Sequence, residues 1–311
     1  MVNDSYSSTN NNLNNLADLA SDDPLRASIR EAAQTVRDTT PLAQSFTNFV
    51  TINLVANAQL AAGGAAAMSF LPDDIADGEV ASGASYINVG TLLPFYEDAL
   101  EEIARHFHAD HHRWVLDPVA AGLGTTRTDI LKSFKAAPPT IIRGNASEII
   151  KLREMWELPL DGDGNGKKHG KSKKSSGPVG VESADDVEAA EESARVLAKF
   201  IAKGDAQGQS AVAVSGETDL VTDGEHTYRL PGGSAMMTKI TGAGCSLGGV
   251  VATYLAVADP LTAAVAASAL YNRASETGEA NSHGPGSFQV AFLDGLWSTT
   301  PEQIAASPIL A

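Results

Sequence analysis

Apolar and polar positions form blocks of two kinds along the chain. From residue 26 onward, segments with helical periodicity are separated by short apolar runs. Four runs are almost continuously apolar: SYINVGTL (85–92), RWVLDPVA (113–120), PTIIRGN (139–145) and SAVAVSGE (210–217). Strands have this composition when helices bury them on both faces. The pattern predicts an α/β fold with a central, mostly parallel sheet and helices on both faces.

Polar side chains follow each of these runs. In an open parallel sheet, ligands bind at the carboxyl ends of the strands, so these residues are candidates for a site. They are Asn88 after the first run, Asp117 within the second, Arg143 and Glu148 around the end of the third, and Ser215 in the fourth. We expect them to meet at one edge of the sheet.

Two segments fall outside this regular pattern. Residues 1–25 are rich in Asn and Ser and predict a disordered polar tail, which leaves 26–311 as a single domain. Residues 160–178 are rich in Gly, Lys and Ser and predict a flexible basic insertion. A P-loop is disfavoured there because Asn165 replaces the required glycine, and an EF-hand because Ser172 replaces the required glutamate.

The charge balance narrows the choice of partners. Lys and Arg total 22 against 38 Asp and Glu, a net charge of −16 that disfavours nucleic acid and anionic membranes. Such an acidic surface suits strong salt, and we interpret it as indicating a halophilic, archaeal source. The polar start lacks a signal sequence, one cysteine excludes an internal disulfide, and no apolar stretch is long enough to span a bilayer. We therefore expect a cytoplasmic protein.

A glycine turn leads into a helical segment at TGAGCSLGG (241–249), which holds the only cysteine, Cys245. Free backbone N–H groups at a helix start bind phosphate or a developing oxyanion, and Gly242 and Gly244 would let the backbone approach such a ligand. The alternative is a tight turn in which glycine only supplies a positive φ. A dinucleotide fingerprint is excluded because Leu247 stands in place of its third glycine.

Two carboxylates near a phosphate site make sense if a cation lies between them and the phosphates. Asp117 and Glu148 could hold Mg²⁺ in this way, and Arg143 could bind a phosphate oxygen directly. The alternatives are structural. Asp117 could be a turn or cap residue before Pro118, and Glu148 could cap a helix after Asn145.

Six motifs taken together resemble the hydroxyethylthiazole kinase family of the ribokinase-like superfamily. In chain order they are TNFVTINLVANAQLAAGGAAAM, YINVGTL, VLDPVAAG, IIRGNASEI, AVSGETDLVTDG and TGAGCSLGGVVATYL, and they extend from about residue 47 to about 290. The resemblance implies transfer of the γ-phosphoryl group of ATP to the hydroxyl of 4-methyl-5-(2-hydroxyethyl)thiazole in thiamin salvage. It also implies a homotrimer with sites at subunit interfaces.

The resemblance further assigns roles to individual residues. Arg143 and Ser215 would contact ATP, although the family usually has Thr at the second position, and Asp117 and Glu148 would organise Mg²⁺. Met68, Gly242 and Asn48 would line the thiazole pocket, and Gly242, Gly244 and Cys245 would form the catalytic loop.

Cys245 occupies the position at which most ribokinase-like kinases carry an aspartate base. A cysteine at a helix start can have a lowered pKa, so we expect this thiol either to accept the alcohol proton late in the transfer or only to shape the pocket.

Two other functions compete with this interpretation. An ATP- or ADP-dependent dehydratase of hydrated NAD(P)H has a similar fold and loop but expects aspartate at Cys245. A non-catalytic thiazole or nucleotide sensor could do without the carboxylates that this chain keeps. The histidines of HFHADHH (106–112) suggest a metal cluster, yet no acidic or thiol partner is spaced to complete one, which favours a helix end and an exposed loop.

Overall fold

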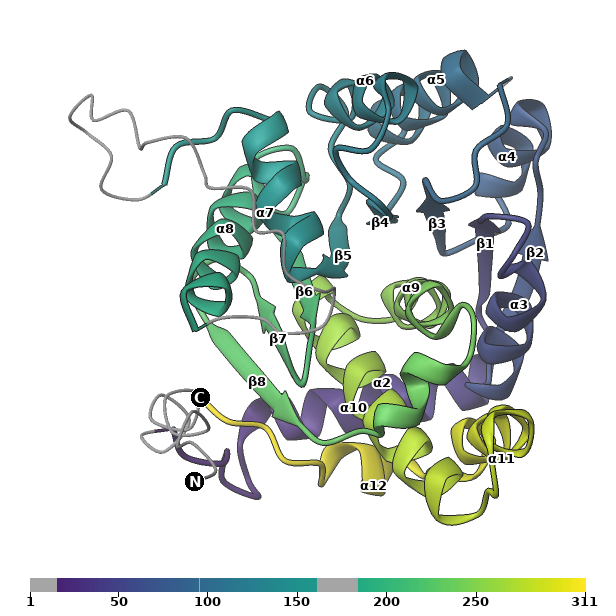
Figure 1. Cartoon of the computed structure of the whole chain (residues 1–311), viewed down its shortest axis with the longest axis vertical. Coiled ribbons are helices and arrows are strands. Elements are labelled where there is room, and N and C mark those ends of the chain that lie inside the picture. The colour runs from purple at the N-terminus through teal and green to yellow at the C-terminus, as the bar shows by residue number, and fades with distance from the viewer. Residues whose placement is uncertain (1–15, 95, 161–183) are drawn as a thin grey trace, which may run out of the picture.

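A computed structural model describes residues 16–94, 96–160 and 184–311 of the chain. Its centre is an eight-stranded sheet with the order β2-β1-β3-β4-β5-β6-β7-β8 (Figure 1). Neighbouring strands from β2 to β6 are parallel, and the β6–β7 and β7–β8 pairs are antiparallel. The strand bounds are β1 Leu42–Phe46, β2 Ala65–Met68, β3 Ala84–Asn88, β4 Trp114–Asp117, β5 Ile141–Asn145, β6 Ala211–Ser215, β7 Thr218–Thr222 and β8 Thr227–Pro231.

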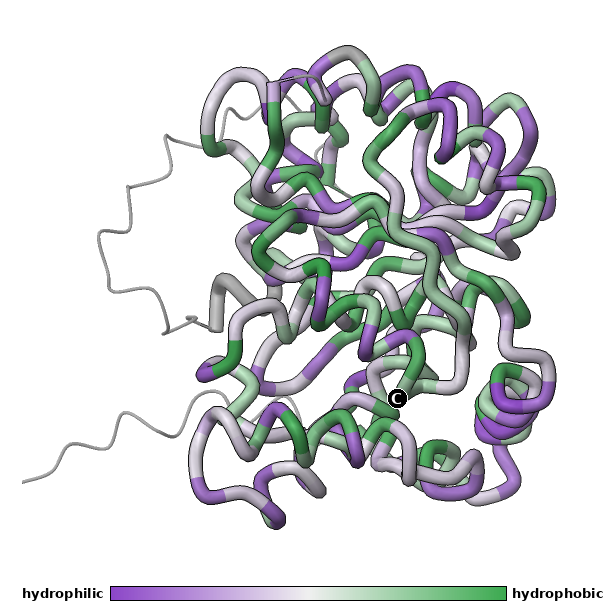
Figure 2. The backbone as a smooth tube through the Cα atoms, turned by 90° about the vertical axis from the view of Figure 1, so that its right-hand side faces the viewer, coloured by the Kyte–Doolittle hydropathy of each residue, from purple (hydrophilic) through white to green (hydrophobic). Residues whose placement is uncertain are grey.

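Helices cover both faces of the sheet, which confirms the predicted fold class (Figure 1). One layer holds α2 Pro24–Thr39, α3 Ile52–Ala61, α9 Ala243–Leu255, α10 Pro260–Ala280, α11 Pro285–Ser298, α12 Pro301–Ala305 and the short 3₁₀ helix η1 Ala235–Lys239. The other holds α4 Pro72–Glu79, α5 Tyr96–Ala109, α6 Thr125–Ser133, α7 Ala146–Met155 and α8 Ala184–Ala202. Each layer buries its own apolar cluster against the sheet, and hydrophilic positions mark the outer helices (Figure 2).

The four apolar runs become the central parallel strands β3, β4, β5 and β6, as predicted. Strand β1, which lies between β2 and β3, escapes the apolar pattern because it buries polar side chains. Ser45 donates a hydrogen bond to Gln59 Oε1 at 2.9 Å, so its hydroxyl is satisfied inside the core. No helix in the described ranges is long and apolar enough to cross a membrane.

The predicted polar tail, 1–25, is wrong for its last ten residues. The backbone N–H of Leu19 donates to the Ile309 carbonyl at 2.9 Å, and α2 begins at Pro24. The buried Arg26 fixes this junction, donating to the Ala305 and Ser307 carbonyls at 2.6 and 2.9 Å. Residues 16–25 are thus tied to the C-terminal segment. The rest of the tail, and the predicted insertion at 160–178 beyond Leu160, lie outside the described residues.

Candidate active site

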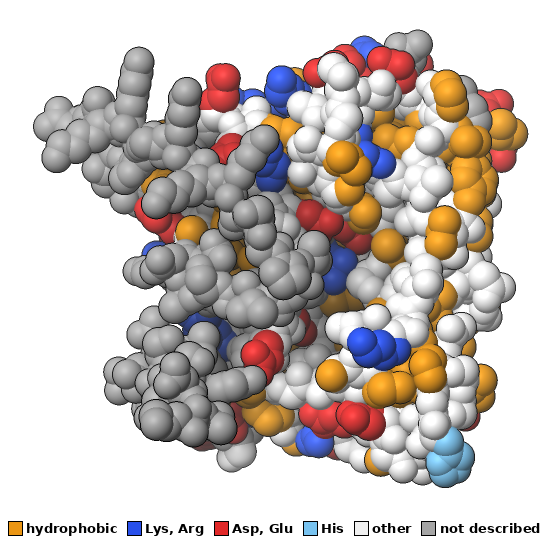
Figure 3. All heavy atoms as spheres, in the orientation of Figure 1, with side chains coloured by type: hydrophobic (Ala, Val, Ile, Leu, Met, Phe, Trp, Pro, Cys, Tyr) orange, Lys and Arg blue, Asp and Glu red, His pale blue; other side chains and the backbone are white. Residues whose placement is uncertain are grey.

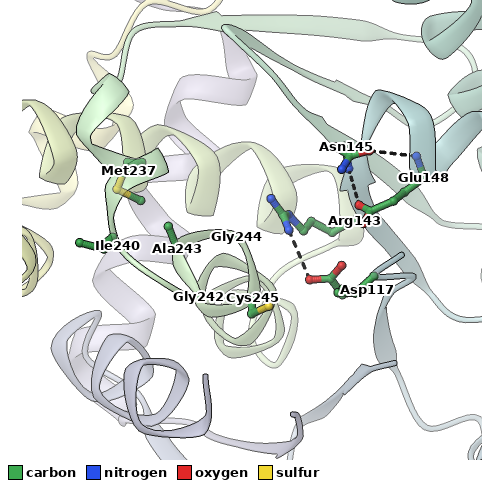
Figure 4. A pocket seen from close by; sticks show the side chains of 11 residues that line it. Asp117, Arg143, Asn145, Glu148, Met237, Ile240, Gly242, Ala243, Gly244 and Cys245 are labelled. Carbon is green, nitrogen blue, oxygen red and sulfur yellow. Dashed lines mark hydrogen bonds and ion pairs between the residues drawn. The ribbon is translucent and has the colours of Figure 1, made fainter. Parts of the chain in front are cut away.

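A cavity of about 290 Å³ lies where the carboxyl ends of β4 and β5 face the start of α9 (Figure 4). It brings together the predicted phosphate, metal and catalytic residues. Its walls are Asp117, Val119, Arg143, Asn145, Glu148, Met237, Ile240, Gly242, Ala243, Gly244 and Cys245.

The two loop glycines serve different purposes. Gly242 precedes the first residue of α9 and has a φ of 91°, a left-handed conformation that favours glycine. Gly244 lies in the first turn, where a Cβ atom would come within 2.8 Å of Arg143 Nη1. The turn alternative therefore accounts for Gly242, whereas Gly244 lets the backbone lie directly against a buried guanidinium.

Arg143 is held in a fixed position at the centre of the site. It lies on β5, and its side chain is 9% exposed. Nη2 donates to Ser215 Oγ at 2.7 Å, and Nη1 donates to Asp117 Oδ2 at 3.3 Å. Ser215, at the end of the neighbouring strand β6, reaches the site through this hydrogen bond and does not itself line the cavity.

Asp117 ends β4 with a completely buried side chain. Its Oδ2 accepts hydrogen bonds from the Tyr86 hydroxyl at 3.0 Å and from Asn88 Nδ2 at 3.3 Å. Burial raises the pKa of this carboxyl, the Glu148 carboxylate adds to the rise, and Arg143 opposes it. Its Oδ1 accepts no hydrogen bond from any described residue, although it is buried. Because its bonds come from side chains, the cap alternative for Asp117 is wrong.

Glu148 does cap a helix, as the alternative predicted. Its backbone N–H donates to Asn145 Oδ1 and its Oε2 accepts from the Asn145 N–H, both at 2.9 Å, which makes a capping box at the start of α7. Its Oε1 accepts from the Ala120 N–H at 2.9 Å. Each oxygen has further lone pairs, so the capping role leaves the carboxylate able to face a cation.

Cys245 lies in the first turn of α9, close to Asp117 and Arg143. Asn48 Nδ2 donates to its Sγ at 3.6 Å. Burial raises the pKa of the thiol, the Asp117 carboxylate raises it further, and Arg143 opposes these effects. The lowered pKa expected from a helix start is therefore wrong, because burial beside a carboxylate disfavours the thiolate.

A buried polar chain lies beneath this site, and the sequence prediction named all of its members except Tyr86. Asn48 donates to Asn88 Oδ1 at 3.0 Å, and Asn88 donates to the Tyr86 hydroxyl at 2.9 Å. Tyr86 then donates to Asp117. Tyr86 was missed because a tyrosine in an apolar strand reads as core. The available signal was its i, i+2 spacing from Asn88, which puts both side chains on one face of β3.

Met68 is set apart from the other predicted residues. It ends the edge strand β2, is half-buried, and pairs in register with Ser45 of β1. It does not line the cavity described above. The residues expected to hold the phosphoryl group are therefore together in this chain, whereas Met68 lies to one side of them.

Comparison with known proteins identifies the family of this chain. The model of the hydroxyethylthiazole kinase family matches residues 33–302. A hydroxyethylthiazole kinase of Bifidobacterium animalis subsp. lactis is 63% identical over 300 residues, covering 96% of each chain. One from Cereibacter sphaeroides is 38% identical, covering 87% of this chain and 93% of its own. The structure of a hydroxyethylthiazole kinase protein from Pyrococcus horikoshii OT3 superposes with a TM-score of 0.73 at 26% identity, covering 91% of this chain and 98% of that one.

The family match and the similar relatives define the class of the protein, an ATP-dependent small-molecule kinase. The chain belongs to the hydroxyethylthiazole kinase family. It is an ATP-dependent kinase that phosphorylates hydroxyethylthiazole, a step in thiamin biosynthesis.

Two expectations change with this result. An ADP/ATP-dependent NAD(P)H-hydrate dehydratase from Bacillus subtilis shares only 14% identity at a TM-score of 0.51, so its likeness is one of fold alone. The expected halophilic, archaeal source is not supported, since relatives 63–64% identical come from Bifidobacterium.

Proposed function

We propose that the transferring phosphoryl group of ATP binds at the start of α9, beside the Arg143 guanidinium. The observation that carries this proposal is the direct apposition of Gly244 and Arg143 in one cavity. Free N–H groups of the first helical turn and a guanidinium are both donors to phosphoryl oxygens. Phosphoryl transfer depends mainly on positioning and on charge neutralisation, which a rigid pair of donors supplies.

Asp117 and Glu148 are proposed to hold Mg²⁺ at the same cavity. Oδ1 of Asp117 supports this role, since a buried acceptor without a partner among the described residues fits a cation. Carboxylate oxygens are also the ligands that Mg²⁺ prefers. When bound, Mg²⁺ would neutralise charge on the ATP phosphates. Within the protein, the bonds from Tyr86 and Asn88 fix the orientation of the Asp117 carboxylate.

Ser215 is proposed to act on ATP together with Arg143. Its hydroxyl accepts the hydrogen bond from Nη2, which orients the guanidinium toward the cavity. Ser215 ends β6 beside Gly216, whose N–H donates to Asp219 Oδ1 at 3.1 Å. This short turn lies next to the proposed phosphate position and would contact the nucleotide.

Cys245 is proposed to shape the acceptor side of the cavity and to keep its proton. The raised pKa of the thiol argues against a role as general base near neutral pH. A loose phosphoryl-transfer transition state needs little help from a base, because the alcohol loses its proton late. The contact with Asn48 then fixes the wall against which the alcohol would lie.

The thiazole pocket is proposed to be completed by a second subunit of a homotrimer. Met68 and Asn48 flank the acceptor side, and the nearby Phe49, Val50 and Leu71 are 43%, 63% and 57% exposed. Hydrophobic side chains gather on the side of the molecule over α4 and β2 (Figure 3). Apolar patches of this kind mark interfaces. We also propose a cytoplasmic location, as suits a biosynthetic kinase.

The test is a direct assay with the purified protein, ATP, Mg²⁺ and the thiazole alcohol, read as formation of the thiazole phosphate. Arg143→Met should lower kcat/KM by roughly 10²- to 10³-fold, as removal of one electrostatic donor does in other enzymes. Light scattering should report the mass of three chains. Full activity of Arg143→Met, or of Asp117→Asn at saturating Mg²⁺, would contradict the residue assignments.

A further inference from the structure

A second group of metal-ligating side chains lies at the opposite end of the sheet from the cavity. Glu79 is the last residue of α4, shortly before β3 begins, and His106 lies in the last turn of α5. Asp110 follows on the loop toward β4. One ligand atom from each of these residues lies within 4.8 Å of the other two. None of the three belongs to the proposed active site.

The separations of these atoms suit a common cation. His106 Nε2 is 3.1 Å from Glu79 Oε2 and 3.5 Å from Asp110 Oδ2. Imidazole nitrogen and carboxylate oxygen bind Zn²⁺ at about 2.0–2.2 Å, which places neighbouring ligand atoms about 3.0–3.5 Å apart. The imidazole nitrogen thus has a carboxylate oxygen at ligand spacing on each side.

The buried member of the group lacks a hydrogen bond. The side chain of Glu79 is 10% exposed, and its Oε2 accepts no hydrogen bond within the described part of the chain. Its 3.1 Å contact with His106 therefore has the distance of an ion pair without the alignment of a hydrogen bond. The imidazole nitrogen thus lies close to two carboxylates without a hydrogen bond to either, an arrangement that a shared metal ion would explain.

A fourth possible metal ligand, His112, lies next to Glu79. His112 is 7% exposed at its side chain, its Nε2 lies 2.9 Å from Ser85 Oγ, and its Nδ1 lies 3.9 Å from Glu79 Oε1. Where Nε2 carries the proton and donates to Ser85, Nδ1 presents a lone pair toward the carboxylate. In that tautomer the Nδ1 lone pair is available to a metal ion held by Glu79.

We propose that Glu79, His106 and Asp110 form a surface site for a divalent transition-metal ion of the Zn²⁺ type, with His112 as an additional donor. Imidazole and carboxylate ligands favour such ions over Mg²⁺, which prefers oxygen alone. The ion would clamp the end of α4 to the end of α5. This site is independent of the function proposed above.

The test uses the full-length protein, stripped of metal with a chelator and titrated with ZnCl₂ in a calorimeter. We expect one equivalent to bind saturably. At free Zn²⁺ about 100 times Kd, the melting temperature should rise by roughly 5 °C. Glu79→Gln and His106→Asn should each weaken binding at least tenfold and abolish the thermal shift, while circular dichroism verifies folding.

His108→Asn provides the matched control, because His108 is an exposed histidine on the same helix outside the cluster. This variant should bind like the unsubstituted protein. The proposal is overturned if the stripped protein shows no saturable binding, or if Glu79→Gln binds as tightly as the original chain. It is also overturned if His108→Asn weakens binding as much as His106→Asn does. The ZnCl₂ titration of the chelator-stripped protein uses the natural sequence, so it does not depend on whether any variant folds.

Discussion

The contact between Gly244 and Arg143 can be tested by adding one methyl group. In Gly244→Ala, the new Cβ would lie 2.8 Å from Nη1 and 3.1 Å from Nη2, whereas ordinary contact begins at 3.4 Å. The guanidinium must therefore shift by several tenths of an ångström. It cannot do so freely, because its hydrogen bonds to Ser215 and Asp117 fix it from two sides.

The expected cost follows from these hydrogen bonds. A hydrogen bond to a charged group contributes about 1.5–3 kcal/mol. If Gly244→Ala displaces the guanidinium so that one such bond is lost in the transition state, kcat/KM should fall roughly 10- to 100-fold. Global stability should change less, because alanine within a helix is favoured over glycine by about 0.5–1 kcal/mol and offsets part of the strain. We therefore expect a large loss of activity with a melting temperature lowered by only a few degrees.

Gly286→Ala is the matched control for this experiment. Gly286 holds the same position in α11 as Gly244 holds in α9, namely the second residue of the helix, and nothing lies within 4 Å of its added Cβ. This variant should keep full activity and equal or higher stability. Steady-state kinetics and thermal melting of both variants test whether the clash with Arg143 lowers activity. Activity of Gly244→Ala within twofold of the original enzyme would refute the reasoning, as would an equal loss in Gly286→Ala.

Three further outcomes are expected. Cys245→Ser should retain kcat/KM within about tenfold between pH 7 and 8, and complete loss of turnover with intact substrate binding would contradict this. Because burial raises the pKa of the Cys245 thiol, iodoacetamide should alkylate it more slowly than a free cysteine. Burial raises the pKa of Asp219 to about 6, so the contribution of this carboxyl to the free energy of unfolding should fall as pH rises from about 4 through 6. Urea unfolding should show the stability of Asp219→Asn, relative to the original protein, increasing over that range. Arg26→Met leaves two buried carbonyls without a donor and should lower the free energy of unfolding, measured by chemical denaturation, by about 2–4 kcal/mol. Arg30→Met, at an exposed position, should lower it by under about 0.5 kcal/mol. Similar values for both variants would contradict the role of Arg26 in joining residues 16–25 to the C-terminal segment.

The parts of the fold that the sequence predicted are those in which burial alone decides the structure. The central strands are buried on both faces, and that leaves a continuous apolar run in each. Strand β1 was missed because Gln44 and Ser45 interrupt its apolar character. Both are buried among polar partners from α3, α4 and β3 that are distant in the sequence. A pattern read along one segment does not contain such partners.

The same limit explains the outcome at the candidate site. Asp117, Arg143 and Glu148 were found because they follow strands whose carboxyl ends share one edge of the sheet. Tyr86 was missed because its role depends on a hydrogen bond to Asp117 on the neighbouring strand β4. Glu79 was missed because it lies 27 residues before His106 and only tertiary packing brings the two together, so the histidine segment seemed to lack an acidic partner.

Cys245 shows why a residue type at a helix start does not by itself fix the chemistry. A helix start favours the thiolate by a fraction of a kcal/mol to about 2 kcal/mol, and that was the basis for expecting a lowered pKa. The structure adds burial and a carboxylate on the neighbouring strand, both of which favour the thiol. Arg143 favours the thiolate, but it also pairs with Asp117 and donates to Ser215, and its effect is smaller than that of burial. Burial and the Asp117 carboxylate outweigh the arginine, so we expect the loop to act through the backbone at Gly244 and the Arg143 guanidinium, with the thiol keeping its proton.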